Sequence, residues 1–139
     1  MTILDTNVIS EVMRSKPSSQ VLSWVQAQAP RELFTTAITV AEIYYGIELL
    51  PRSKRRQALQ AAADRIFTLD FSDRTLAFDG DAAIIFSRIC ARRRGFGRPI
   101  SQSDAQIAAI AQANGAVLAT HNTADFAQCD IKLVDPWRP

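Results

Sequence analysis

The sequence predicts an α/β fold, a three-layer α/β/α sandwich built on a central parallel sheet. Three observations support this prediction. Short apolar runs, which favour strands, alternate with stretches whose apolar residues recur every three or four positions, as in amphipathic helices. Strands separated by helices need crossover connections, and such connections make neighbouring strands parallel. The chain has 139 residues, enough for one substantial core, so we expect a single domain over residues 1–139.

The first half of the chain contains two predicted strands and four predicted helices. The strands are the short apolar runs at residues 2–4 and 33–36. Side chains that can cap a helix mark the helix starts, and prolines mark the ends of the first three helices. The expected caps are Asp5 or Thr6, Ser18 or Ser19, Thr39, and Ser53, and the prolines are Pro17, Pro30 and Pro51. The third helix reaches Leu50, the fourth ends near Ala63, and residues 66–69 are expected to be extended.

The second half begins with the longest helical pattern in the chain, from Thr75 to Arg94, with Gly95 as the expected C-cap. The remaining expected elements are, in order, a helix capped by Ser101 or Ser103 and ended by Asn114-Gly115, a strand at 116–119, a helical turn near 123–126 and a strand at 132–134. The sequence contains no internal repeat, low-complexity tract or linker.

Composition restricts the class of protein. Hydrophobic residues make up 47% and charged residues 22%, which is usual for a globular protein and argues against disorder. The sequence shows no signal-peptide pattern and no apolar run near the ~20 residues that span a bilayer, so no membrane association is expected. The two cysteines, Cys90 and Cys129, lack metal-ligand spacing and suit a reducing compartment. The expected location is therefore the cytoplasm.

Basic residues are unevenly distributed, although the net charge is only +2. Most of them are arginines, which suit bidentate contact with phosphate or carboxylate groups. They form two clusters, the first of Arg52, Lys54, Arg55 and Arg56, and the second of Arg88, Arg92, Arg93, Arg94 and Arg98. Each cluster is either a solvated helix face or a contact for an anionic partner, and the sequence leaves both interpretations open. The candidates for such a contact in the second cluster are Arg92, Arg93, Arg94 and Arg98.

Four acidic residues stand at predicted strand ends or helix starts: Asp5, Glu42, Asp104 and Asp125. Ligands of open α/β sheets bind beyond the carboxyl ends of the strands, where Asp5 falls. Carboxylates that converge there lose hydration and repel one another, which raises their pKa values. A hard divalent cation such as Mg²⁺ relieves that repulsion. The alternative is a local role for each residue: Asp5 and Asp104 as helix caps, Glu42 as the partner of a helix dipole, and Asp125 as a turn acid.

Four sequence blocks carry a resemblance to a known family. They are Ile3-Leu4-Asp5-Thr6-Asn7, Ala41-Glu42-Ile43-Tyr44-Tyr45-Gly46, Ser103-Asp104-Ala105-Gln106-Ile107-Ala108 and Thr120-His121-Asn122-Thr123-Ala124-Asp125-Phe126. In this order the blocks resemble those of the PIN domain, most closely in the VapC/FitB-type toxins of bacterial toxin–antitoxin pairs. The resemblance covers essentially the whole chain, and four blocks in order are far more specific than one.

The resemblance implies a small nuclease that cleaves RNA with Mg²⁺ or Mn²⁺. It assigns the core metal-binding and catalytic role to Asp5, Glu42 and Asp104, with Asp125 as the fourth acid. The polar residues that would support the metal, its waters or the acids are Thr6 or Asn7 and Thr120 or Asn122. The only histidine, His121, is expected to be a turn residue beside substrate or solvent rather than an acid–base catalyst.

The resemblance also implies partners. These are a cognate antitoxin, an RNA substrate, a second copy of the chain in a homodimer, and DNA only indirectly through the antitoxin. Apolar residues of the predicted helices Thr39–Leu50 and Ser53–Ala63, with Tyr44 and Tyr45, either supply part of the dimer interface or pack in the core. The second arginine cluster would then contact RNA phosphates or the antitoxin, in a salt-sensitive manner.

Two other functions fit parts of the sequence. A phospho-accepting signalling module also places acids around Mg²⁺ at strand ends, but it needs an acid pair near the first strand and a well-placed lysine. Only Asp5 stands at the first strand, and Lys16, Lys54 and Lys132 are poorly placed. A catalytically inactive PIN-like binding protein would lack one or more acids, and none is missing. The sequence does not define which RNA is cut or whether one or two ions bind.

Overall fold

The computed structural model describes residues 1–139 and contains a five-stranded sheet with the strand order β3-β2-β1-β4-β5. The strands are β1 Thr2–Leu4, β2 Leu33–Thr36, β3 Thr75–Leu76, β4 Val117–Ala119 and β5 Lys132–Val134. All four neighbouring pairs are parallel. The predicted parallel sheet is therefore confirmed, with β1 at its centre.

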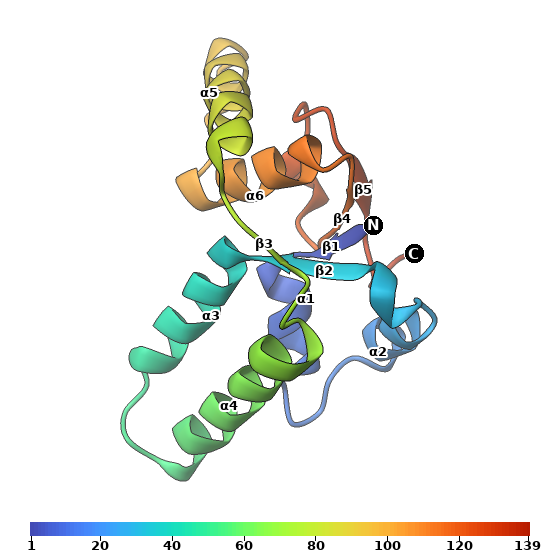
Figure 1. Cartoon of the computed structure of the whole chain (residues 1–139), viewed down its shortest axis with the longest axis vertical. Helices are drawn as coiled ribbons and strands as arrows, with labels where there is room; N and C mark the ends of the chain where they lie inside the picture. Colours follow the sequence, from blue (N-terminus) through green and yellow to red (C-terminus); the bar gives the residue numbers. More distant parts are fainter.

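Helices cover both faces of the sheet (Figure 1). Their bounds are α1 Thr6–Val12, α2 Ser19–Gln26, α3 Ala37–Glu48, α4 Lys54–Arg65, α5 Gly80–Gly95 and α6 Gln102–Ala113, with shorter helical turns at Pro30–Glu32, Ile66–Asp70 and Thr123–Phe126. In Figure 1, α5 and α6 lie above the sheet, and α1, α2 and α4 lie below it. The structure thus confirms the predicted three-layer α/β/α sandwich.

Alternating strand residues divide the hydrophobic core into two halves. Ile3 and Leu118 pack with residues of α5 and α6, whereas Leu4 and Ala119 pack with residues of α1 to α4. Successive side chains of a strand point to opposite faces, so a sheet buried on both sides needs apolar residues at every position. Helix α6 is buried on nearly all sides between Ala105 and Ala111. This packing holds its first turn in place at the edge of the sheet.

Most of the predicted helix starts are correct. Asp5, Ser18, Ser53 and Ser101 each cap a helix by accepting a hydrogen bond from a backbone N–H in the first turn. The third helix begins earlier than predicted, because Thr36 rather than Thr39 is the cap. The Thr36 hydroxyl accepts a hydrogen bond from the Thr39 backbone N–H at 3.1 Å, and Thr39 is fully buried inside the helix.

The segment between α4 and α5 differs from the prediction in three places. Residues Ile66–Asp70 form a π-helical turn that continues α4, where an extended piece was expected. Thr75–Leu76 is a strand paired with β2, and α5 begins only at Gly80 after the cap Asp79. Two strand residues are too few to show a two-residue repeat, so only pairing with β2 reveals the strand. The left-handed residue after α5 is Gly97, with φ +69°, rather than Gly95.

No helix of the structure combines the length and the apolar character that crossing a membrane requires.

Candidate functional site

A polar pocket of about 550 Å³ opens at the carboxyl ends of β1 and β4. Its lining residues are Asp5, Thr6, Asn7, Ser10, Glu11, Arg14, Glu42, Asp104, His121, Asn122 and Trp137. They come from α1 and the residues that flank it, from the second turn of α3, from the first turn of α6, and from the segments that follow β4 and β5. Three of the four predicted acids therefore share one pocket, at the sheet edge where α/β proteins bind ligands.

The carboxylate of Asp5 is held rigidly at the end of β1, and it is only 4% exposed. Its Oδ1 accepts a hydrogen bond from the Thr6 backbone N–H at 2.8 Å, which caps α1. Its Oδ2 accepts one from the Thr120 hydroxyl at 2.7 Å and one from Asn7 Nδ2 at 3.2 Å. Asp5 is thus both a helix cap and a member of the acidic pocket, so the two interpretations of the sequence do not exclude each other.

The surroundings of Asp5 raise its pKa from 3.8 to about 6. Burial is the main cause, because it removes water from the charged form. Hydrogen bonds from Thr120 and Thr6 oppose the shift, and the charges of Asp104 and Glu42 add to it. The charges of Glu42 and Asp104 therefore act on Asp5, although the three residues are far apart in the sequence.

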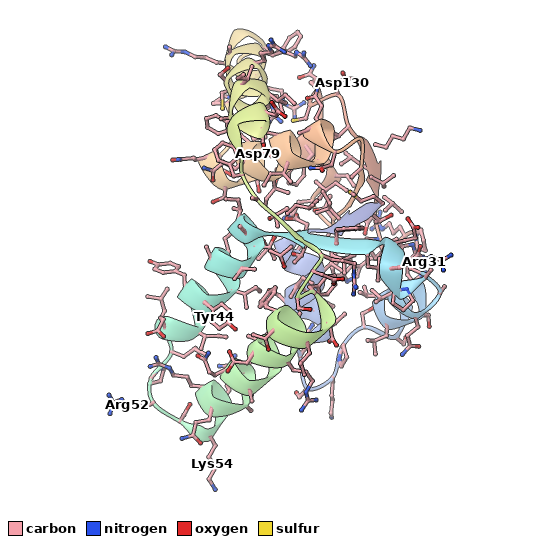
Figure 2. All side chains as sticks on the ribbon, in the orientation of Figure 1. Arg31, Tyr44, Arg52, Lys54, Asp79 and Asp130 are labelled. Atoms are coloured by element: carbon pink, nitrogen blue, oxygen red, sulfur yellow. The ribbon has the colours of Figure 1, made fainter.

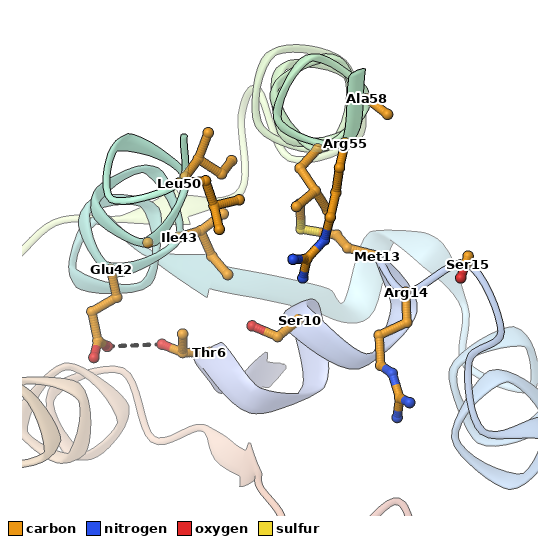
Figure 3. Close-up of a pocket in the computed structure, with 13 residues that line it drawn as sticks. Thr6, Ser10, Met13, Arg14, Ser15, Glu42, Ile43, Leu50, Arg55 and Ala58 are labelled. Atoms are coloured by element: carbon orange, nitrogen blue, oxygen red, sulfur yellow. Dashed lines mark hydrogen bonds between the residues drawn. The ribbon is translucent and has the colours of Figure 1, made fainter. Parts of the chain in front are cut away.

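Glu42 is held by a row of threonine hydroxyls. Thr6 Oγ1 donates to Glu42 Oε1 at 2.8 Å, as drawn in Figure 3, and lies 3.0 Å from Thr39 Oγ1. Thr36 Oγ1 donates to Thr39 Oγ1 at 3.4 Å. Since the Thr6 proton is used on Glu42, Thr39 must donate to Thr6, and the hydroxyls align from β2 towards the carboxylate. The sequence singled out Thr6 but missed Thr36 and Thr39, whose contacts depend on tertiary packing.

Asp104 lies in the first turn of α6 and is partly exposed. Its backbone N–H donates to the capping hydroxyl of Ser101 at 3.2 Å. Burial is the main cause that raises the pKa of Asp104, and the charge of Asp125 raises it further. The hydrogen bond with Ser101 and the charge of Arg93 lower it. The charge of Asp125 therefore acts on Asp104, just as the charge of Asp104 acts on Asp5.

Asp125 lies on the Thr123–Phe126 turn and is exposed. It does not line the pocket, but its charge reaches Asp104. No three of the chain's His, Cys, Asp and Glu side chains converge closely enough to ligate one ion directly. The carboxylates present suit Mg²⁺ in its usual form, with one or two direct carboxylates and several waters.

The predicted supporting residues surround these acids. Asn7 links three partners, because its Nδ2 donates to Asp5 Oδ2 and to Thr120 Oγ1, both at 3.2 Å, and its Oδ1 accepts from the His121 backbone N–H at 3.2 Å. The Asn122 backbone N–H donates to Thr120 Oγ1 at 3.1 Å. These contacts fasten the loop after β4 to the start of α1, so the geometry of the pocket is fixed on both sides of Asp5.

Arg93 corrects one prediction. It was a candidate for contact with an anionic partner, but it is only 4% exposed and its donors are used inside the protein. Its guanidinium donates to the backbone oxygens of Asp125 at 2.7 Å, Ala127 at 3.0 Å and Arg98 at 2.8 Å, and no carboxylate lies within ion-pair distance. Arg93 therefore fastens the turn that carries Asp125 to the end of α5.

The other candidate arginines of this cluster, Arg92, Arg94 and Arg98, are exposed and remain predicted contacts. The first cluster lies at the opposite end of the molecule, where Arg52 and Lys54 extend away from the turn between α3 and α4 (Figure 2). Within that cluster Arg56 pairs with Glu48 at 3.1 Å.

A second pocket, of about 660 Å³, lies between α1, α3 and α4 (Figure 3). Apolar side chains form much of its wall, among them Met13, Ile43, Ile47, Leu50 and Leu59, and Arg55 from α4 also lines it. Four residues belong to both pockets: Thr6, Ser10, Arg14 and Glu42. An apolar surface thus leads directly to the acidic pocket.

Comparison with known proteins gives one consistent result. The sequence matches the PIN domain over residues 2–132. It is 39% identical to the plasmid stability protein StbB of Pseudomonas syringae pv. tomato, over 99% of both chains. It is 37% identical to the VapC ribonuclease Y4jK of Sinorhizobium fredii, over 100% of this chain and 99% of that one. The structure superimposes on FitAcB from Neisseria gonorrhoeae with a TM-score of 0.91, 33% identity and complete coverage of both chains.

The raised pKa of Asp5 makes the stability of the metal-free chain depend on pH. The folded chain holds the Asp5 proton more tightly than the unfolded chain, so stability falls as the pH rises through the range from 3.8 to about 6. This difference corresponds to about 3 kcal/mol. We expect the free energy of unfolding of the wild type, relative to Asp5→Asn, to fall by up to that amount between about pH 4 and pH 7. Urea unfolding of both proteins in EDTA, at a series of pH values, measures this difference in the free energy of unfolding. A difference that does not change with pH would contradict the raised pKa of Asp5.

The buried guanidinium of Arg93 should make a large contribution to stability. We expect Arg93→Ala to lower the free energy of unfolding by about 3 kcal/mol, because several buried carbonyl oxygens lose their donor. The matched control is Arg94→Ala, an exposed neighbour in the same cluster, which should change stability by less than about 0.5 kcal/mol. Equal effects of the two substitutions in denaturant unfolding would show that Arg93 does not fasten the turn.

Proposed function

Because the chain belongs to the PIN-domain family, in the group of the VapC and FitB toxins, we propose that it is a metal-dependent endoribonuclease that acts as the toxin of a toxin–antitoxin pair. One observation carries the catalytic part of this proposal. Asp5, Glu42 and Asp104 come from three different helices or their caps and line one pocket. Burial raises the pKa of Asp5, and the charges of Asp104 and Glu42 raise it further. Such acids favour a positive charge nearby, and Arg14, the one arginine that lines the pocket, is paired with Glu11.

Asp5, Glu42 and Asp104 are the residues that would hold Mg²⁺ or Mn²⁺, directly or through water, with Asp125 as an outer fourth acid. When bound, the ion supplies an activated water and neutralises charge on the phosphate that is attacked. The chain's own residues hold the acids in place for this. Thr120 and Asn7 fix the orientation of the Asp5 carboxylate, and the Thr6 hydroxyl fixes that of Glu42.

The phospho-accepting alternative is not supported by the lysines of the chain. Such a module needs a lysine beside the acids, but Lys16, Lys54 and Lys132 are all exposed and none of them lines the acidic pocket. The inactive alternative has no support from the residues, because all four acids of the family pattern are present.

The proposal includes an antitoxin partner. Solved relatives are complexes: FitAB bound to a DNA fragment, at 33% identity, and DNA-bound VapBC from Salmonella typhimurium, at 25% identity. The apolar pocket of Figure 3 suits a partner segment, and its continuity with the acidic pocket would let a basic side chain of that segment reach Glu42. DNA would be contacted only through the antitoxin.

The proposal also includes a homodimer and a cytoplasmic site of action. Tyr45 on α3 and Leu49 at its C-cap are 66% and 67% exposed, which leaves apolar surface for a second copy. Tyr44 is used differently from its neighbour, since its hydroxyl donates to Asp64 Oδ1 at 2.7 Å and its ring packs on Phe67 of the same chain.

We expect Asp5→Asn and Asp104→Asn each to reduce RNA cleavage at least about 100-fold, because each removes a charge from the pocket that the reaction requires. The measurement is the rate of cleavage of cellular RNA in Mg²⁺, with circular dichroism to show that the variants are folded. The control is Asp81→Asn, which alters an exposed acid in the first turn of the neighbouring helix α5 and should keep full activity. Full activity of either pocket variant would refute the proposed site.

Removal of divalent ions should stop the reaction without unfolding the chain. In EDTA we expect no RNA cleavage, and addition of Mg²⁺ or Mn²⁺ should restore it, because the acids alone supply no positive charge to the phosphate. Ca²⁺, which prefers more ligands and longer distances, should restore it poorly. Cleavage that continues undiminished in EDTA would exclude the metal-dependent mechanism.

A further inference from the structure

Two ring-bearing side chains stack on each other at the acidic pocket. The rings of His121 and Trp137 lie with their centroids 4.3 Å apart and their planes inclined by 36°. His121 follows β4 and Trp137 follows β5, two paired strands whose carboxyl ends meet at this edge. They are the only residues with rings among those that line the pocket.

The stack is held in place from several sides. Asp135 Oδ1 accepts a hydrogen bond from the Trp137 backbone N–H at 2.9 Å and lies 3.4 Å from His121 Nδ1. The His121 backbone N–H donates to Asn7 Oδ1, and Asn7 in turn donates to Asp5. The backbone of His121 is thus tied to the Asp5 carboxylate through Asn7 and through the neighbouring Thr120.

The stack remains accessible although it is held rigidly. The side chain of His121 is 49% exposed, whereas that of Asp135, which orients it, is only 17% exposed. Packing of a flat ligand on a rigid, open ring costs little conformational entropy, because the side chain is already ordered before the ligand binds. The arrangement therefore has the properties of a stacking platform.

The chemistry of the pocket indicates what packs there. Its acids repel phosphates, so a nucleic acid strand needs another source of affinity near them. Unpaired bases of single-stranded RNA bind by stacking on aromatic and histidine rings, largely independently of sequence. Arg14, on the same pocket, uses Nη1 to contact Glu11 and is 66% exposed, so its remaining donors can reach a phosphate. Groups that can contact a base, a phosphate and a metal ion thus line the same pocket.

We propose that the His121–Trp137 stack is a nucleobase subsite, where an unpaired base adjacent to the cleaved phosphate of the RNA packs on the exposed ring surface. This inference rests on the proposed ribonuclease function and names how the same pocket holds its substrate. Asp135 supports the stack, because its carboxylate lies beside the His121 ring and accepts a hydrogen bond from the Trp137 backbone N–H. His121 contributes through its ring rather than as a proton donor.

Trp137 fluorescence reports directly on the subsite. The chain has two tryptophans, so Trp24→Phe leaves Trp137 as the only one, and Asp104→Asn in the same chain keeps added RNA intact. The probes are a single-stranded RNA of mixed sequence and an abasic ribose-phosphate strand of equal length. We expect saturable quenching by the RNA and no quenching by the abasic strand, because only a base can stack. Equal quenching by both strands, or by neither, would overturn the subsite.

Substitution of His121 separates the contribution of the ring surface from that of the ring nitrogens. In the Asp104→Asn background we expect His121→Ala to weaken RNA binding about tenfold and His121→Phe to retain it within about twofold, as stacking requires. The control is Leu69→Ala, an exposed apolar residue on the turn after α4, which should leave the Kd unchanged. A His121→Phe variant that binds as weakly as His121→Ala would show that the ring surface is not what holds RNA.

Failure of this inference is distinguishable from failure of the proposed function. The wild-type chain is offered cellular RNA in Mg²⁺ in parallel. Cleavage by the wild type, together with an unquenched Trp137, would refute the subsite alone. If the wild type neither cuts nor binds RNA, both the proposed function and the subsite are refuted.

Discussion

The burial of one carboxylate, that of Asp5, is the constraint on which the rest of the site depends. Three donors hold it where β1 ends and α1 begins, and the removal of water raises its pKa to about 6. A fold that needed only a helix cap would gain nothing from placing it near Glu42 and Asp104, whose charges raise that pKa further. Under the proposed function, a bound cation would offset the free-energy cost of charging Asp5.

The sequence revealed the fold where local chemistry decides it. Capping residues such as Ser53 and Ser101 mark helix starts through contacts with their own neighbours, so they are readable without the structure. The strand Thr75–Leu76 was missed because it exists only through pairing with β2. Arg93 was misread for a similar reason: in sequence it is one of several adjacent arginines, and only the approach of the 123–129 segment buries it.

The residues of the site also fall into two groups, those that the sequence identified and those that only the structure revealed. Strand-end position and acidic character identified Asp5, Glu42 and Asp104, which one pocket brings together. The places of Thr39 and Trp137 beside the site were missed, because Thr39 was interpreted as a helix cap and a tryptophan near the C-terminus has no distinctive local pattern. Asp135 also has no distinctive local pattern, yet its carboxylate lies beside the His121 ring and binds the Trp137 backbone N–H. An acid in an apolar part of the sequence stands out because its burial is costly. The residues that position such acids are recognised only from tertiary contacts, which the sequence does not display.

The most direct test of the central claim is calorimetric titration of the metal-free chain with Mn²⁺, near pH 6, in two buffers of different ionisation enthalpy. If the acids share a cation site, binding is saturable and releases protons, because Asp5 is half protonated at that pH. Asp5→Asn should then bind more weakly and release fewer protons. Identical titrations of the two proteins, or no saturable binding by the wild type, would contradict the account.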